Sequence, residues 1–271
     1  MSSRRSSSAS AARQDAACPA VHISEDGRSR YLHLGGTPWI QGSMRLGNAW
    51  AIDLEYVQRM MAWLLFVEPD SVSERRALQL GLGAAALTKF AFRKLGMRTS
   101  CIELNPQVVA ACRQWFRLPA DSERLEVRIA DAGLAIAEPE WQGVVDALQV
   151  DLYDQEAAAP VLDDADFYAR CRDTLTPDGC MTVNLFGRDS SFVRSVQRMA
   201  GAFGPGAVWC FRPTREGNTV VLALRDAASA PSPEGMQARA EVIRARWGLP
   251  AHKWIKVLRR LEDVPDVASM A

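Results

Sequence analysis

Short apolar runs alternate with helix-like segments through the middle of the chain. In the helix-like segments apolar residues recur every three or four positions, as at Val108, Cys112 and Phe116, which is the spacing of one buried helix face. Asn105 and Pro106 predict the start of that helix, because Asn caps helix N-termini and Pro suits the first turn. The alternation predicts an α/β fold, a doubly wound parallel sheet with helices on both faces. The expected strands are residues 77–80, 99–102, 125–129, 144–150, 180–185, 207–212 and 219–224, and further helices are expected at 84–95, 166–175 and 192–202.

The residues before this region have a different pattern. Three short β-like segments, residues 21–23, 31–34 and 39–41, are separated by the turn dipeptides at 26–27 and 35–36. They predict a small antiparallel sheet that precedes the main domain.

A further segment, residues 53–67, carries apolar residues at helical spacing and predicts a helix with one buried face. Its polar residues Tyr56, Gln58 and Arg59 could reach a ligand, but we assign them solvated or packing roles.

The chain closes with a Pro-, Ala- and Ser-rich linker, followed by two helix-like segments at 234–247 and 253–261 that we expect on the outside. We expect a disordered tail that is rich in Ser, Ala and Arg, a small sheet with its helix, a central sheet domain, and a C-terminal helical extension. These four regions are residues 1–20, 21–70, 71–226 and 227–271.

Composition excludes several classes of protein. The 271 residues contain 32 basic and 32 acidic side chains, so no net charge attracts the chain to nucleic acid or to an anionic membrane. No apolar run approaches the roughly 20 residues that a membrane helix needs. Six scattered cysteines without a CxxC pair favour reduced thiols in the cytoplasm, and the three histidines lie outside the central region, so we expect no metal site. A transit peptide in the Arg-rich tail is a less favoured interpretation.

The first strand of the central domain runs into Gly81-Leu82-Gly83, and the second ends at Glu103. Strand, glycine turn, helix, strand and acid are the parts of a nucleotide-binding βαβ unit. The glycines let the backbone approach the ligand, the helix N-terminus offers free N–H groups, and the acid can accept both ribose hydroxyls.

Two further strands also end in acids, at Asp131 and Asp151. The carboxyl ends of parallel strands meet at one edge of a sheet, where ligands bind. A nicotinamide-binding protein needs no Asp131-Ala132 pair, whereas an S-adenosyl binder can use Asp131 for the adenine amino group and Glu103 for the ribose. The closing strands around residues 216–218 also fit the β-hairpin of a methyltransferase-like (Rossmann-like) sheet. We therefore expect an adenosyl-sulfonium site in residues 71–226.

These motifs resemble the spermidine synthase-like (polyamine aminopropyltransferase) family over residues 31–224. The small sheet before the adenosyl-binding domain is specific to that family, and ordinary methyltransferases lack it. The segments that carry the resemblance are Trp39-Ile40-Gln41, Gly81-Leu82-Gly83, Ile102-Glu103-Leu104-Asn105-Pro106, Ala130-Asp131-Ala132 and Val150-Asp151-Leu152-Tyr153-Asp154.

The resemblance implies aminopropyl transfer from decarboxylated S-adenosylmethionine to a diamine such as putrescine, by a homodimer. It assigns the role of general base to Asp151 and contact with the diamine to Asp154, and we expect Tyr153 to bind the substrate as well. It assigns the thioadenosine part of the co-substrate to Gln41, Glu103 and Asp131, and we expect Gly81, Gly83 and Ala132 to bind the co-substrate as well.

The chain departs from the family at three places. Ala84 stands where the family has an aspartate for the aminopropyl amine, Asp151-Leu152-Tyr153-Asp154-Gln155 replaces Asp-Ser-Ser/Thr-Asp-Pro, and Asn184 stands where a glutamine is usual. Three alternatives therefore stay open beside aminopropyl transfer. They are an S-adenosylmethionine-dependent methyltransferase acting on a small acceptor, a non-catalytic adenosyl-binding relative and, last, a nicotinamide-dependent oxidoreductase.

Overall fold

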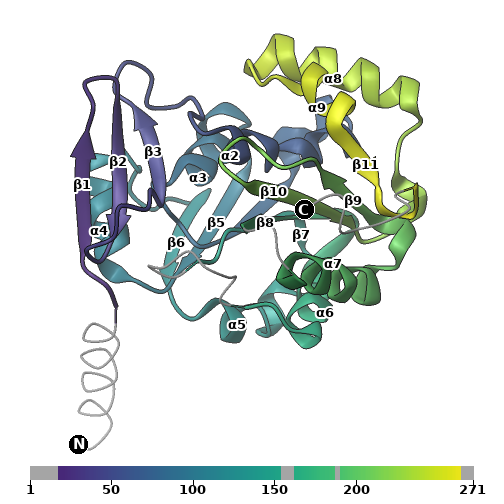
Figure 1. Cartoon of the computed structure of the whole chain (residues 1–271), viewed down its shortest axis with the longest axis horizontal. Helices are drawn as coiled ribbons and strands as arrows, with labels where there is room; N and C mark the ends of the chain where they lie inside the picture. Colours follow the sequence, from purple (N-terminus) through teal and green to yellow (C-terminus); the bar gives the residue numbers. More distant parts are fainter. Residues whose placement is uncertain (1–17, 154–161, 187–189, 264–271) are drawn as a thin grey trace, which may run out of the picture.

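Two sheets form the framework of the protein (Figure 1). The computed structural model describes residues 18–153, 162–186 and 190–263. The smaller sheet is antiparallel, in the order β1-β2-β3, and the larger sheet has eight strands in the order β11-β9-β10-β8-β7-β4-β5-β6. The strands of the small sheet are β1 (Val21–Glu25), β2 (Ser29–Leu34) and β3 (Gly42–Arg45).

The large sheet is parallel in one half and antiparallel in the other. The pairs β4–β5, β5–β6, β4–β7 and β7–β8 are parallel, whereas β8–β10, β10–β9 and β9–β11 are antiparallel. This arrangement confirms the predicted doubly wound α/β fold with a closing hairpin. The strands are β4 (Arg76–Leu80), β5 (Arg98–Glu103), β6 (Leu125–Ile129), β7 (Val145–Val150), β8 (Leu175–Phe186), β9 (Val208–Phe211), β10 (Asn218–Leu224) and β11 (Leu258–Arg260).

Helices cover the large sheet. Figure 1 shows α6 and α7 along one side of the sheet and α8 and α9 along the other. The longer helices are α4 (Pro106–Trp115), α6 (Ala165–Thr174), α7 (Ser190–Phe203), α8 (Pro233–Trp247) and α9 (Ala251–Val257), and the short ones include α2 (Glu55–Arg59), α3 (Ala86–Lys89) and α5 (Ala132–Ala135). Within the described ranges no helix is long and apolar enough to cross a membrane.

The predicted helix over residues 53–67 is wrong in length. Only α2 is α-helical there, and a 3-10 helix, η1 (Ala62–Phe66), follows it. Residues 60–67 are all buried, since η1 packs against β8 on one side and against α8 and α9 on the other. The prediction of a single buried helix face is wrong for this segment, because other elements cover it on both sides.

The segment after the glycine turn also differs from the prediction of one helix over residues 84–95. Ala85 adopts a left-handed conformation with φ of 58°, α3 begins after it, and a π-helical segment, η3 (Phe90–Lys94), completes the run. A left-handed residue cannot belong to a right-handed helix, so the helix starts later than the apolar spacing suggests.

Three other boundaries are corrected. The third strand of the small sheet is β3, directly after residues 39–41 and not at them. Strand β8 begins at Leu175 and takes in the expected turn at 176–179, with an irregular register opposite β7. The last expected helix ends at Val257, because residues 258–260 form β11 and pair with β9. The C-terminal extension is therefore helical over α8 and α9 but also adds an edge strand to the large sheet.

A second apolar cluster joins the small sheet to the glycine turn. Leu32 and Met44 of the small sheet pack with Leu82, Ala84 and Ala85 of the turn, and α4 completes the cluster. This packing holds the small sheet over the carboxyl ends of β4 and β5, where a ligand site is expected.

Candidate functional site

A cavity of about 970 Å³ lies at the carboxyl ends of β4, β5 and β7. Its wall contains every predicted site residue that the structure describes, namely Gln41, Gly81, Gly83, Glu103, Asp131, Ala132, Asp151 and Tyr153. The remaining candidate, Asp154, lies outside the described residues. Residues from the segment that leads into β3, from the glycine turn and from three later segments of the chain therefore meet at one site.

The glycine turn is required by close packing as well as by backbone geometry. Gly81 has a φ of +84°, and a Cβ on it would lie 2.2 Å from the carbonyl oxygen of Asp151. A Cβ on Gly83, with a φ of +50°, would lie 2.9 Å from the carbonyl oxygen of Gln41. Only glycine fits at these two positions, which bring the turn against both the end of β7 and the small sheet.

Glu103 ends β5 and is fixed by two backbone donors. Its Oε2 accepts a hydrogen bond from the backbone N–H of Leu82, and its Oε1 accepts one from that of Asn105, both at 2.8 Å. Burial raises the pKa of this carboxyl, while the backbone donors act in the opposite direction. A carboxylate has about four acceptor positions, so Glu103 retains two for the paired hydroxyls of a ribose.

Asp131 follows β6 and caps α5, since its Oδ1 accepts a hydrogen bond from the backbone N–H of Leu134 at 3.0 Å. Its neighbour Ala132 is buried, and both residues lie on the cavity wall. The cap occupies one carboxylate position and holds the side chain in place. The remaining acceptor positions suit an amino group such as that of adenine.

Asp151 directly follows β7 and is held by neutral donors. Asn184 Nδ2 donates to Asp151 Oδ1 at 2.9 Å, and Tyr56 Oη donates to Asp151 Oδ2 at 3.5 Å. Asn218 Nδ2 donates to Asn184 Oδ1 at 3.1 Å, which orients the Asn184 amide toward Asp151. Burial raises the pKa of Asp151 to about 6, against the lowering effect of its two hydrogen bonds. A carboxyl group with this pKa is a suitable proton acceptor near neutral pH.

Tyr153 has a fixed orientation on the same wall. Its Oη donates to the carbonyl oxygen of Asn184 at 3.0 Å, and burial raises the pKa of its phenol. The ring is therefore placed beside Asp151, on the side where Asn184 also lies.

The sequence predicts solvated or packing roles for Tyr56, Gln58 and Arg59. Gln58 donates to the carbonyl oxygen of Ile52, and Arg59 is buried and donates to the carbonyl oxygen of Arg212, so both are structural. Tyr56 instead lies on the cavity wall and contacts Asp151. No signal in the sequence marks this role, because the contact joins residues 95 positions apart.

An aromatic pair stands at the same cavity. Trp39 of the segment before β3 and Phe186 at the end of β8 make an edge-to-face contact with ring centroids 6.0 Å apart, and both line the cavity. Cys18 and Pro19, which the sequence assigned to the tail, also lie on the wall, and the carbonyl oxygen of Pro19 accepts from Asn105 Nδ2.

The cavity wall is acidic. Across the part of the chain that the structure describes, no Lys, Arg or His lines this cavity, whereas six carboxylates do. These are Asp53, Glu55, Glu103, Asp131, Asp151 and Glu216. Such a wall favours a cationic ligand and disfavours an anionic one. Among the described residues no group of three or more His, Cys, Asp and Glu has an arrangement that could hold a metal ion.

Ala84, the main departure from the family pattern, is buried on the far side of the glycine turn. It lines a second cavity of only about 20 Å³, whose wall also includes Asp53, Tyr56 and Asp151. A Cβ on Gly42 would lie 2.7 Å from the Cβ of Ala84, so β3 packs directly on this alanine.

The fold and the site together define an α/β protein of the methyltransferase-like class, with an acidic cavity at the carboxyl ends of its strands. Comparison with individual known proteins supports this classification, whereas no family model matches the chain. A polyamine aminopropyltransferase of Chromobacterium violaceum is 31% identical to it over 245 residues, which cover 90% of this chain and 91% of that protein. The chain belongs to the polyamine aminopropyltransferase family.

Solved structures show the same fold. A probable spermidine synthase from Corynebacterium glutamicum superposes with a TM-score of 0.65 at 17% identity, covering 84% of this chain and 91% of that one. Human methyltransferase-like protein 13, solved with SAH, gives a TM-score of 0.63 at 20% identity, covering 81% of this chain and all of the other. The fold expected from the sequence is confirmed by both.

Proposed function

We propose that this protein transfers an aminopropyl group from decarboxylated S-adenosylmethionine to a diamine such as putrescine, with Asp151 as the general base. The observation that carries the proposal is the half-buried Asp151 carboxyl on the wall of an acidic cavity, with a pKa raised to about 6 and hydrogen bonds from neutral donors.

The residues on the wall fit the thioadenosine part of this co-substrate. Glu103 has two acceptor positions left for the ribose hydroxyls, and Asp131 has positions left for the adenine amino group. Gln41, Gly81 and Gly83 lie on the same wall. We assign these residues and Ala132 to binding of the co-substrate.

The charge of the wall favours the decarboxylated form. Decarboxylated S-adenosylmethionine carries a sulfonium and an ammonium, both positive. Ordinary S-adenosylmethionine has an additional carboxylate, which would enter a cavity lined by six carboxylates and by no described basic side chain. The acidic wall therefore supports aminopropyl transfer over the methyltransferase alternative.

Asp151 has a clear task in the transfer. An alkylamine has a pKa near 10, so at neutral pH it enters as an ammonium and must lose a proton before it can attack. Asp151 takes that proton and orients the nitrogen, which then forms a bond to the sulfonium-bound carbon of the aminopropyl group. The carbon–sulfur bond breaks with its electron pair on sulfur, leaving neutral methylthioadenosine.

The rest of the wall serves positioning. A displacement of this kind depends largely on in-line placement of amine and carbon, which Tyr56, Tyr153 and Asn184 secure by fixing the surroundings of Asp151. Asp154, which the family resemblance assigns to the diamine, and the homodimer stay predictions.

Isothermal calorimetry tests the choice of co-substrate. Decarboxylated S-adenosylmethionine, S-adenosylmethionine and methylthioadenosine are titrated in parallel into the full chain. We expect the decarboxylated form to bind most tightly. Tight binding of S-adenosylmethionine alone would favour the methyltransferase alternative, and no binding of any of the three would favour a role without adenosyl ligands.

A further inference from the structure

We infer that Asp53 binds the terminal ammonium of the aminopropyl group. Ordinary S-adenosylmethionine carries a carboxylate on the same carbon as its ammonium, so like-charge repulsion from Asp53 disfavours that ligand and favours the decarboxylated co-substrate. This inference rests on the proposed function, because it assigns a residue to one part of the same ligand. Asp53 would supply the negative charge that Ala84, in the place of the family's aspartate, cannot supply.

Asp53 lies where the large cavity meets the small one. It is on the wall of both, and the small cavity is also lined by Ala84 of the glycine turn and by Asp151. The ammonium is three carbons from the sulfur, and the attacked carbon must face the amine that Asp151 deprotonates. A carboxylate that shares a small cavity with both Asp151 and the glycine turn is therefore correctly placed for the ammonium.

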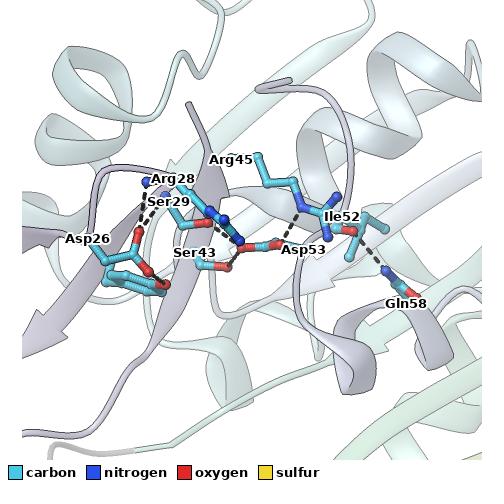
Figure 2. A network of polar contacts seen from close by, with 9 residues as sticks. Asp26, Arg28, Ser29, Ser43, Arg45, Ile52, Asp53 and Gln58 are labelled. Carbon is cyan, nitrogen blue, oxygen red and sulfur yellow. Dashed lines mark hydrogen bonds and ion pairs between the residues drawn. The ribbon is translucent and has the colours of Figure 1, made fainter. Parts of the chain in front are cut away.

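The Asp53 side chain is held rigidly by two strands of the small sheet (Figure 2). Ser29 Oγ of β2 and Ser43 Oγ of β3 donate to its Oδ2 at 2.8 and 3.2 Å, and Arg45 Nε donates to its Oδ1 at 2.5 Å. Three donors leave about one of the four acceptor positions of the carboxylate for a ligand. Arg45 is half exposed and does not line the cavity, so the bound carboxylate would bridge Arg45 outside and the ammonium inside.

The other acids on the wall are less suitable. The Glu55 side chain is 50% exposed and pairs with Arg59, and Glu216 is exposed. Glu103 and Asp131 hold backbone N–H groups and belong to the nucleoside end, and Asp151 serves the acceptor amine. By contrast, the Asp53 side chain is only 16% exposed.

The test compares two ligands, one with the aminopropyl group and its sulfonium and one that lacks both. Decarboxylated S-adenosylmethionine carries the ammonium, and methylthioadenosine lacks it. For Asp53→Asn in the full chain we expect calorimetry to show affinity for the decarboxylated compound lowered by about 10- to 100-fold, with affinity for methylthioadenosine unchanged. Asp53→Glu, which keeps the charge, should recover part of the loss.

Asp26→Asn is the matched control. Asp26 belongs to the same polar network, where it accepts from the backbone N–H groups of Arg28 and Ser29, but it lines neither cavity (Figure 2). We expect it to bind both ligands as the wild type does. An Asp53→Asn protein that loses both ligands equally, or keeps the wild-type ratio, would overturn the inference and leave the proposed function standing. A wild type that binds methylthioadenosine as tightly as the decarboxylated compound would count against the proposed function itself.

Discussion

At the scale of single residues, the proposed reaction depends on the proton affinity of Asp151. Its hydrogen-bond partners in the described structure are the neutral side chains of Asn184 and Tyr56, and burial raises its pKa to about 6. The group is therefore ionised at neutral pH and still basic enough to accept a proton from an ammonium that it holds.

Replacement of Asp151 by Asn should remove the general base and keep the shape of the side chain. We expect kcat to fall by about 10²- to 10⁴-fold in Asp151→Asn, the usual range for loss of a general base. Affinity for the decarboxylated co-substrate should change little, as measured by calorimetry. Asp178→Asn, at an exposed position away from the cavity, is the control and should keep full activity. Retained turnover in Asp151→Asn would remove Asp151 from the role of base.

The pH profile of kcat/KM should have an acidic limb at about pH 6. Below that pH Asp151 is protonated and cannot accept a proton, so kcat/KM should fall as pH decreases. The Asn184 hydrogen bond lowers the pKa of Asp151, so Asn184→Ala should raise that pKa and move the limb to higher pH. The exposed Asn48→Ala is the control. A limb that stays in place in Asn184→Ala would show that another group controls it.

The sequence predicts part of this residue-scale picture. Glu103, Asp131 and Asp151 could be grouped because they end parallel strands of one sheet, and such ends meet at one edge. Tyr56 and Asp53 could not be placed, since their positions depend on how α2 and the small sheet pack against that edge. Periodicity carries no information about such tertiary contacts.

At the scale of elements, the approach of the glycine turn to the end of β7 is the critical contact. Gly81→Ala would introduce both a strained φ and a Cβ 2.2 Å from the Asp151 carbonyl oxygen. Gly204 separates the two effects, because its φ is +88° and a Cβ there meets nothing within 4 Å. We expect Gly204→Ala to lower the free energy of unfolding by about 1–3 kcal/mol, because its backbone, with φ of 88° and ψ of 141°, is one that non-glycine residues rarely adopt. Gly81→Ala should lower the free energy of unfolding by roughly 1–3 kcal/mol more than Gly204→Ala does, because its added Cβ is crowded.

Urea unfolding of the two glycine variants measures this difference. Equal losses of unfolding free energy in Gly81→Ala and Gly204→Ala would contradict the close approach of the turn to β7.

Two elements show where prediction of the fold from the sequence failed. Residues 60–67 are buried on every side, and Ala85 is left-handed, so neither shows the one-faced pattern of an ordinary helix.

At the scale of the whole molecule, a buried lysine joins three parts of the chain. Lys89 Nζ donates to the carbonyl oxygens of Ala49 and Phe116, at 3.0 and 2.7 Å, and burial lowers its pKa to about 8. In the unfolded chain a lysine has a pKa near 10.4. Between these values the unfolded state holds a proton that the folded state lacks, so the free energy of unfolding should rise with pH, by about 3 kcal/mol from this group.

Urea unfolding between pH 7 and 10.5 isolates the contribution of Lys89. The difference in unfolding free energy between the wild type and Lys89→Met should grow as pH increases. Lys94→Met, at an exposed position of the same segment, is the control and should show a constant difference from the wild type. A constant difference in Lys89→Met as well would contradict the lowered pKa.

The overall architecture was predictable because alternating strands and helices admit few arrangements. The eighth strand of the large sheet could not be predicted, because it spans only residues 258–260 and follows a helix without a turn signal. Their strand character comes from pairing with β9, which is a property of the whole fold and not of the local sequence.

The proposed function depends on aminopropyl transfer between ligands that are bound in the acidic cavity. Mass spectrometry of a reaction that contains the full chain, decarboxylated S-adenosylmethionine and putrescine tests it most directly. We expect spermidine and methylthioadenosine in equal amounts with the wild type, and the same products formed about 10²- to 10⁴-fold more slowly with Asp151→Asn under single-turnover conditions. Absence of spermidine with the wild type, or a methylated amine and S-adenosylhomocysteine when S-adenosylmethionine is supplied instead, would contradict it.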